Sequence, residues 1–290
     1  GKGDDQGQPL PNVSPLDKII VAFAGPLFSF LLAVAFAFVV WQVGKPQQNG
    51  KDSTTVGWVD PNGPAWKAGL RPGDKIVSVD GHVVTQFAPP SQDSVKWRII
   101  TSEGTNIAIK YLRDGQENTV YPVPYIRPNK WYERRSLRQI LIDAPYPAII
   151  LGVMTNSPAA LAGLQANDEV FALNGEKIYS PFAMMNAEEM LTNGPVKPVT
   201  LTIRRGQEEF QRTLTAEQPI TPAKAGPSFG IVGWVVHSSE TLAHPGPAEQ
   251  IRESAGQIFA TINTVLSRKS DVGVQQLGGA VMIIRAYKSF

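Results

Sequence analysis

Residues 59–81 read VDPNGPAWKAGLRPGDKIVSVDG, and residues 153–175 read VMTNSPAALAGLQANDEVFALNG. The second stretch repeats the first at a fixed offset, so the chain contains two copies of one structural unit. The residues common to both include Pro64, Ala65, Ala68, Gly69, Leu70, Asp74 and Gly81, matched by Pro158, Ala159, Ala162, Gly163, Leu164, Asp168 and Gly175.

Each copy predicts the same order of local structure. The Pro-Ala start and the following alanines predict a brief helix that ends at Gly-Leu, where the glycine takes the left-handed cap. Alternating apolar residues at 76–79 and 170–173 predict a strand, and the pairs Asp80-Gly81 and Asn174-Gly175 predict tight turns. Asn167 stands where the first copy has Gly73, and asparagine tolerates a left-handed backbone better than most residues.

The sequence after each repeat completes an α+β unit. A helix is predicted at 183–191 in the second copy. Strand pairs are predicted at 106–112 with 120–123, and at 199–204 with 210–214, joined through Asp114-Gly115 and Gly206.

The repeated core resembles the PDZ domain in its bacterial, circularly permuted form, a small β-sandwich or partly open barrel with helices. The resemblance implies a first PDZ domain at 45–126, a linker at 127–145 and a second PDZ domain at 146–218. PDZ domains add an extended peptide, often a chain end, to a sheet edge while backbone N–H groups hold its carboxylate.

By that resemblance, the peptide-binding residues lie just before each Pro-Ala segment. Glycine suits a loop that directs N–H groups at an anion. The alternative is that these are ordinary strand starts that bind no peptide, and the large Trp58 favours it in the first copy. The expected binding residues are Val56, Gly57, Trp58, Ile150, Leu151, Gly152 and Val153.

A membrane-spanning helix is predicted at 16–44, after an N-terminal loop at 1–15. No residue from Ile19 to Gly44 is charged, and a helix of that length reaches roughly 39 Å at about 1.5 Å per residue. Its flanking residues Lys18 and Lys45 are balanced, so the positive-inside rule gives no orientation. The residues expected to pack against other helices are Gly25, Pro26, Ser29, Ala33 and Ala37, unless this small-residue face is only the usual composition of such helices.

Three further segments follow the second repeat. Residues 219–247 are expected to form an extended linker, and apolar residues at intervals of three and four predict an amphipathic helix at 248–268. This helix would lie on the membrane or on a domain. Residues 269–290 are expected to start a following membrane-associated segment.

The flanks resemble the site-2 protease family. Residues 11–33 resemble its second membrane helix, with Ala24-Gly25-Pro26 intact and Ser29 where the family usually has asparagine. The segment 276–281 resembles the turn before its third membrane helix, with Ala280 where proline is usual. The order of span, two PDZ domains, amphipathic helix and turn matches the family over nearly the whole chain.

This resemblance implies a zinc metalloprotease of the membrane, with the PDZ pair gating or recognising membrane-protein substrates or peptide C-termini. It also implies a bacterial inner-membrane location with the PDZ domains on the extracytoplasmic side. In the family, zinc is held by a His-Glu-x-x-His helix and a Leu-Asp-Gly segment, and neither motif occurs in residues 1–290. We therefore expect the chain to contain no catalytic residue and to bind no zinc by itself, as an excerpt of a longer protein.

Composition excludes other functions. The formal net charge of +2 gives no electrostatic track for nucleic acid, and the absence of cysteine excludes thiolate chemistry. The spacing of His237, Glu240 and His244 does not match a zinc site. Residues 226–230 match the Gly-x-Ser-x-Gly motif, but a serine nucleophile elbow needs a helix after it, and the segment that follows is strand-like. The remaining alternatives are a non-catalytic, membrane-tethered PDZ adaptor and, much less favoured, a trypsin-like protease with PDZ modules.

Overall fold

The computed structural model describes residues 14–48, 53–88, 91–128, 136–192, 195–218, 226–235 and 240–266. Contacts divide the chain into two units. One combines Gly1–Pro46 with Leu242–Ala255, and the other combines Gln47–Thr241 with Gly256–Phe290.

The first unit is built around a long apolar helix, α1 (Pro15–Val43), close to the predicted span. A capping box fixes its start, because the Ser14 hydroxyl accepts the N–H of Asp17 and the Asp17 carboxylate bonds back to Ser14. The helix is long and apolar enough to cross a membrane, and its apolar side chains are exposed. Strand β1 (Lys45–Gln48) pairs with β14 (Glu240–Ala243), which precedes α6 (Pro247–Leu266), the predicted amphipathic helix.

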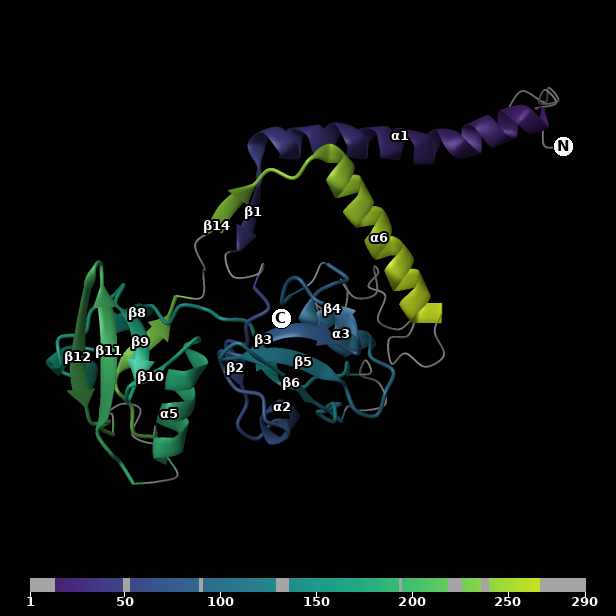
Figure 1. Cartoon of the computed structure of the whole chain (residues 1–290). Helices are drawn as coiled ribbons and strands as arrows, with labels where there is room; N and C mark the ends of the chain where they lie inside the picture. Colours follow the sequence, from purple (N-terminus) through teal and green to yellow (C-terminus); the bar gives the residue numbers. More distant parts are fainter. Residues whose placement is uncertain are drawn as a thin grey trace. The chain divides into compact units, whose positions relative to one another are not determined.

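The second unit contains two β-modules (Figure 1). The first module has a four-stranded sheet, helices α2 (Pro64–Ala68) and α3 (Val95–Thr101), and the strand pair β2 (Trp58–Val59) with β7 (Ile142–Asp143). Its sheet order is β4 (His82–Val83), β3 (Lys75–Val79), β5 (Ile109–Arg113) and β6 (Gln116–Val120). Its core includes Phe87, Ile109 and Ile140, all fully buried.

The second module has the same arrangement. Helices α4 (Pro158–Leu161) and α5 (Phe182–Thr192) accompany its sheet, and β8 (Ile150–Val153) pairs with β13 (Ile231–Trp234). The sheet order is β10 (Glu176–Lys177), β9 (Glu169–Leu173), β11 (Val199–Arg205) and β12 (Glu208–Leu214). The core of this module includes Leu201, Ile203 and Phe229.

The predicted turns and caps are present in both copies. Gly69 and Gly163 follow the short helices with φ of +106° and +81°. Asn167 takes φ +70° where Gly73 has +94°, which confirms that asparagine adopts the left-handed backbone here. The Asp80-Gly81 and Asn174-Gly175 turns close the β3–β4 and β9–β10 hairpins.

Each module also contains an ion pair between a buried aspartate and a partly exposed arginine. The Asp74 carboxylate is 1% exposed and accepts the Arg113 Nε and Nη2 at 2.7 and 2.8 Å. Asp168 and Arg205 repeat the pair at 2.6 and 2.8 Å. Each arginine also donates to the carbonyl of the capping glycine, Gly69 or Gly163, and so ties a sheet strand to the end of a short helix.

Two strands complete the modules from segments that the sequence analysis assigned to linkers. Strand β7 lies within 127–145 and β13 lies within 219–247, yet each pairs with a strand near the start of its module. Ile142 and Phe229 from these segments are buried in the two cores. Each module therefore extends beyond its strand pair β5–β6 or β11–β12.

Candidate functional site

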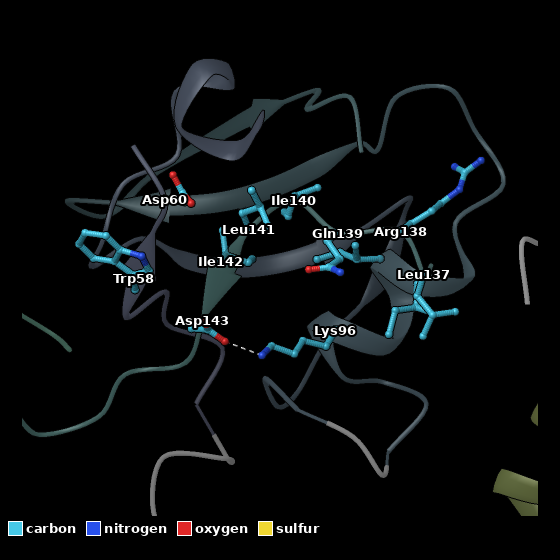
Figure 2. Close-up of a pocket in the computed structure, with 12 residues that line it drawn as sticks. Trp58, Asp60, Lys96, Leu137, Arg138, Gln139, Ile140, Leu141, Ile142 and Asp143 are labelled. Atoms are coloured by element: carbon cyan, nitrogen blue, oxygen red, sulfur yellow. Dashed lines mark hydrogen bonds and ion pairs between the residues drawn. The ribbon is translucent and has the colours of Figure 1, made fainter. Parts of the chain in front are cut away.

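A cavity of about 320 Å³ opens in the first module between α3 and the segment that contains β7 (Figure 2). One wall comes from the helix, the opposite wall from the extended segment, and Trp58 with Asp60 adds to the lining. The lining residues are Trp58, Asp60, Lys96, Ile99, Ile100, Leu137, Arg138, Gln139, Ile140, Leu141, Ile142 and Asp143.

Helix α3 supplies apolar contact and one positive charge. Its N-cap is the buried Ser94, whose hydroxyl accepts the N–H of Trp97. Ile99 is buried in the module core and also lines the cavity. Lys96 and Ile100 lie four residues apart, on one face of the helix, and both line the cavity.

The β7 wall offers an unpaired strand edge. The carbonyls of Leu141 and Asp143 accept the N–H groups of Asp60 and Gly57 at 3.0 and 2.8 Å. Backbone groups of successive residues in a strand face opposite edges, so the N–H and C=O of Ile142 face away from β2, toward the cavity. In the described part of the chain β7 has β2 as its one strand neighbour, so this edge has room for an added strand.

The turn that leads into β7 is strained. Leu141 has φ +59°, a left-handed conformation that costs a non-glycine residue roughly 1–2 kcal/mol. In the second module Gly230 takes the corresponding place with φ +80°, and its carbonyl accepts the N–H of Met154 as that of Leu141 accepts Asp60. The segment at 140–142 therefore corresponds to 229–231.

The cavity carries opposite charges close together. Lys96 Nζ lies 2.5 Å from Asp143 Oδ1, and the two side chains are 39% and 37% exposed. Such a pair contributes at most about 1 kcal/mol, because water screens both charges. A carboxylate that enters the cavity can therefore compete for the Lys96 ammonium at small cost.

The binding residues predicted in the first copy are placed mostly in the interior. Val56 is fully buried, and the N–H of Gly57 donates to the backbone carbonyl of Asp143. A Cβ on Gly57 would lie 2.3 Å from the Ala144 carbonyl oxygen, so this glycine serves a close backbone approach. Of the three predicted residues, Trp58 lines the cavity.

The residues predicted in the second copy form β8. Ile150 is fully buried and its N–H donates to the backbone carbonyl of Asp168, whereas Leu151 is exposed. Gly152 and Val153 pair with Gly233 and Ile231 of β13. The chain itself thus occupies this edge of β8, and peptide binding by these residues stays a prediction.

The predicted packing face of α1 is exposed over most of its length. Gly25, Pro26, Ser29 and Ala33 are exposed, whereas Ala37 is 6% exposed. The Ala37 carbonyl accepts the side-chain amide of Gln250 at the start of α6, at 3.0 Å. Packing of this face against another helix stays a prediction.

Sequence reasoning missed both walls of the cavity. Helix α3 is rich in β-branched and aromatic residues, which lower helix propensity, and the N-cap Ser94 was its main signal. The segment 137–143 lies within 127–145, the range expected to be a linker. Its alternation of Ile140 and Ile142 with Leu141 and Asp143 was a weak strand signal.

The described residues do not fit a zinc site. Among them no group of three or more His, Cys, Asp or Glu side chains is placed to hold a metal ion. His244 instead lies with Nδ1 2.9 Å from the Trp41 carbonyl oxygen. No metal-dependent step is therefore assigned to these residues.

Comparisons with known proteins bear on the fold of the two modules. The family model for the PDZ domain matches residues 55–89 and 149–205, within both modules. The regulator of sigma-E protease RseP of Salmonella typhimurium is 24% identical over 290 residues, covering 92% of this chain and 60% of that protein. A "putative zinc metalloprotease" of Vibrio cholerae is 24% identical over 299 residues, covering 97% of this chain and 63% of that protein.

The chain resembles the central portion of a site-2 protease. It spans about three fifths of the length of the RseP and Vibrio relatives. The protein SA1105 of Staphylococcus aureus, also named as a zinc metalloprotease, is 33% identical over 110 residues, which cover 38% of this chain and 23% of that protein. The site-2 protease resemblance predicted from the sequence is confirmed, and it includes PDZ-domain sequence.

Proposed function

We propose that this chain is the substrate-recognition portion of a membrane-embedded, site-2-type zinc metalloprotease. In this proposal the two β-modules are tandem, circularly permuted PDZ domains that gate or recognise substrates for proteolysis within the membrane. The first module binds an extended chain end in the cavity between α3 and β7. This places recognition in the described residues and peptide-bond cleavage elsewhere in the whole protein.

The observation that carries the proposal is the free edge of β7 beside an apolar cavity. An extended peptide that pairs with this edge gains main-chain hydrogen bonds, and its side chains gain apolar contact with Ile99 and Ile100. Lys96 places a positive charge within reach of a terminal carboxylate. PDZ-domain sequence in the same module supports this mode of binding.

The membrane location rests on α1 and on the relatives. Helix α1 has 29 residues and is long and apolar enough to span a membrane. We propose that it crosses a bacterial inner membrane and that the modules lie on the extracytoplasmic side. Zinc would be held by segments of the whole protein that supply its ligands, and the described residues would present substrate.

Peptide binding tests the recognition role. The chain, held in detergent micelles, is titrated into a fluorescein-labelled hexapeptide that ends in valine with a free carboxylate, and anisotropy is measured. We expect Ile100→Asp to weaken binding at least about tenfold, because a charged group enters an apolar wall. Val83→Asp is the matched control, since Val83 is 65% exposed and outside the cavity lining. Equal affinities of the two variants would show that this cavity is not the binding site.

Cleavage by the whole protein separates a protease from a non-catalytic adaptor. The whole protein is reconstituted in vesicles with a membrane-spanning test substrate, and the products are followed by gel electrophoresis. We expect cleavage that a zinc chelator abolishes and added zinc restores. Peptide binding without any cleavage would instead support a membrane-tethered PDZ adaptor.

A further inference from the structure

The second module holds a carboxylate at the turn that corresponds to the strained turn of the first. Its segment 228–230 leads into β13 as 139–141 leads into β7, and both segments make a β-bridge just before the turn. The carboxylate belongs to Glu188 of α5. This glutamate comes from the helix of the second module, as Lys96 comes from the helix of the first.

The turn binds Glu188 through donors that suit any carboxylate. Glu188 Oε1 accepts the backbone N–H of Phe229 at 2.9 Å and the hydroxyl of Ser228 at 3.1 Å. The Ser228 hydroxyl in turn accepts the N–H of Gly230 at 3.0 Å, so it is oriented by the same turn. Phe229 is fully buried, which fixes the donor N–H in place. Hydrogen bonds of this kind to an ionised acceptor are about twice as strong as neutral ones.

The two modules differ in the charge that faces this turn. In the first module the α3 residues that line the cavity are Lys96, Ile99 and Ile100, none of them acidic. In the second module an internal acid occupies the turn. A terminal carboxylate that approached the second turn would meet both an occupied donor set and a negative charge.

We propose that Glu188 fills a carboxylate-binding site of the second module from within, so that a free chain end binds there only when Glu188 is displaced. The inference rests on the proposed function, because it takes peptide chain ends as the ligands of these modules. It assigns the Gly-x-Ser-x-Gly segment at 226–230 to carboxylate binding. The ligand class is an extended peptide with a free C-terminal carboxylate.

The test uses the 290-residue chain with Ile100→Asp, so that binding in the first module is suppressed. Glu188→Ala is added to this background, and anisotropy is measured with the valine-ended hexapeptide and with its C-terminal amide. We expect Glu188→Ala to tighten binding of the free acid at least about tenfold, with little change for the amide. No gain for the acid, or an equal gain for both peptides, would overturn the proposal.

A second variant distinguishes the proposed blocking role of Glu188 from a purely structural one. Glu188→Gln keeps an oxygen that accepts the Phe229 N–H but removes the charge, so the module should keep its unfolding transition. We expect this variant to bind the free acid more tightly than the Ile100→Asp background. A folded Glu188→Gln chain with unchanged affinity would also overturn the proposal. If the unmodified chain does not bind the peptide but the Ile100→Asp/Glu188→Ala chain does, peptide binding by the first module is contradicted and the inference about Glu188 is supported.

Discussion

At the scale of single residues, backbone conformation explains which substitution the repeat tolerates. Asn167 adopts φ +70° at the position of Gly73. We expect Asn167→Ala to lower the free energy of unfolding by about 1 kcal/mol, because the left-handed backbone is less favourable for alanine than for asparagine. Asn167→Gly should stay within about 0.5 kcal/mol of the parent. Urea unfolding monitored by tryptophan fluorescence measures both, and equal losses for the two variants would contradict the backbone explanation.

A second residue-scale prediction concerns the ion pair of the first module. Arg113→Ala leaves the buried Asp74 with the N–H of Arg71 as its remaining donor among the described residues. We expect a loss of about 2 kcal/mol, the cost of a buried group that loses its partner, reduced because Arg113 is partly exposed. Arg113→Lys keeps the charge but not the two-pronged contact and should lose about half as much. A loss below about 0.5 kcal/mol for Arg113→Ala would show that the pair is not stabilising.

The pH dependence of this contribution follows from the arginine. The hydrogen bond to Asp74 raises the pKa of Arg113, although desolvation opposes the change. A raised pKa means that the stabilisation is complete below the unfolded pKa and is lost as pH rises through the folded pKa. The stability difference between the parent and Arg113→Ala should therefore be constant between about pH 7 and pH 9.

At the scale of elements, β7 and β13 determine where the modules end. A chain that stops at residue 218, the boundary expected from the sequence, lacks β13 and the buried Phe229. We expect it to lose about 3–5 kcal/mol in the second module compared with a chain that stops at 235, because a buried aromatic side chain is removed. Urea unfolding of the two truncated chains gives the difference. Equal stability would show that β13 is dispensable.

The elements also show what the sequence could predict. The turns at Asp80-Gly81 and Asn174-Gly175, the strands β3 and β9 and helix α5 follow from local patterns in and after the repeat, and the structure confirms them. The predicted strand at 120–123 is misplaced, because β6 runs from Gln116 to Val120 directly after the Asp114-Gly115 turn. The pairings β2–β7 and β8–β13 join short strands that lie far apart in the chain, and no local pattern encodes such a partner.

The site was harder to predict than the fold for the same reason. Its walls, α3 and β7, lie far apart in the sequence, and both contribute residues to the core cluster that contains Phe87 and Ile140. The family resemblance directed attention to 56–58 and 150–153, and of these residues Trp58 lines the cavity. The glycine in each predicted loop was taken as freedom to bind an anion, whereas Gly57 lies against the backbone of Ala144.

At the scale of the whole molecule, sequence similarity to the relatives covers most of the chain. Similarity extends over 92% of the chain to RseP and 97% to the Vibrio protein, so the matched stretch includes both modules. One chain therefore carries a helix long and apolar enough to span a membrane and two modules to which we assign substrate recognition.

Hydrogen exchange with and without peptide tests the central claim most directly. The chain is labelled in deuterated buffer alone and with a saturating concentration of the valine-ended hexapeptide, and the protection of each segment is measured by mass spectrometry. We predict that the peptide slows exchange in the segment 139–143, because an added strand takes up the free edge of β7. Unchanged exchange in 139–143 under conditions where the peptide is bound would contradict this account.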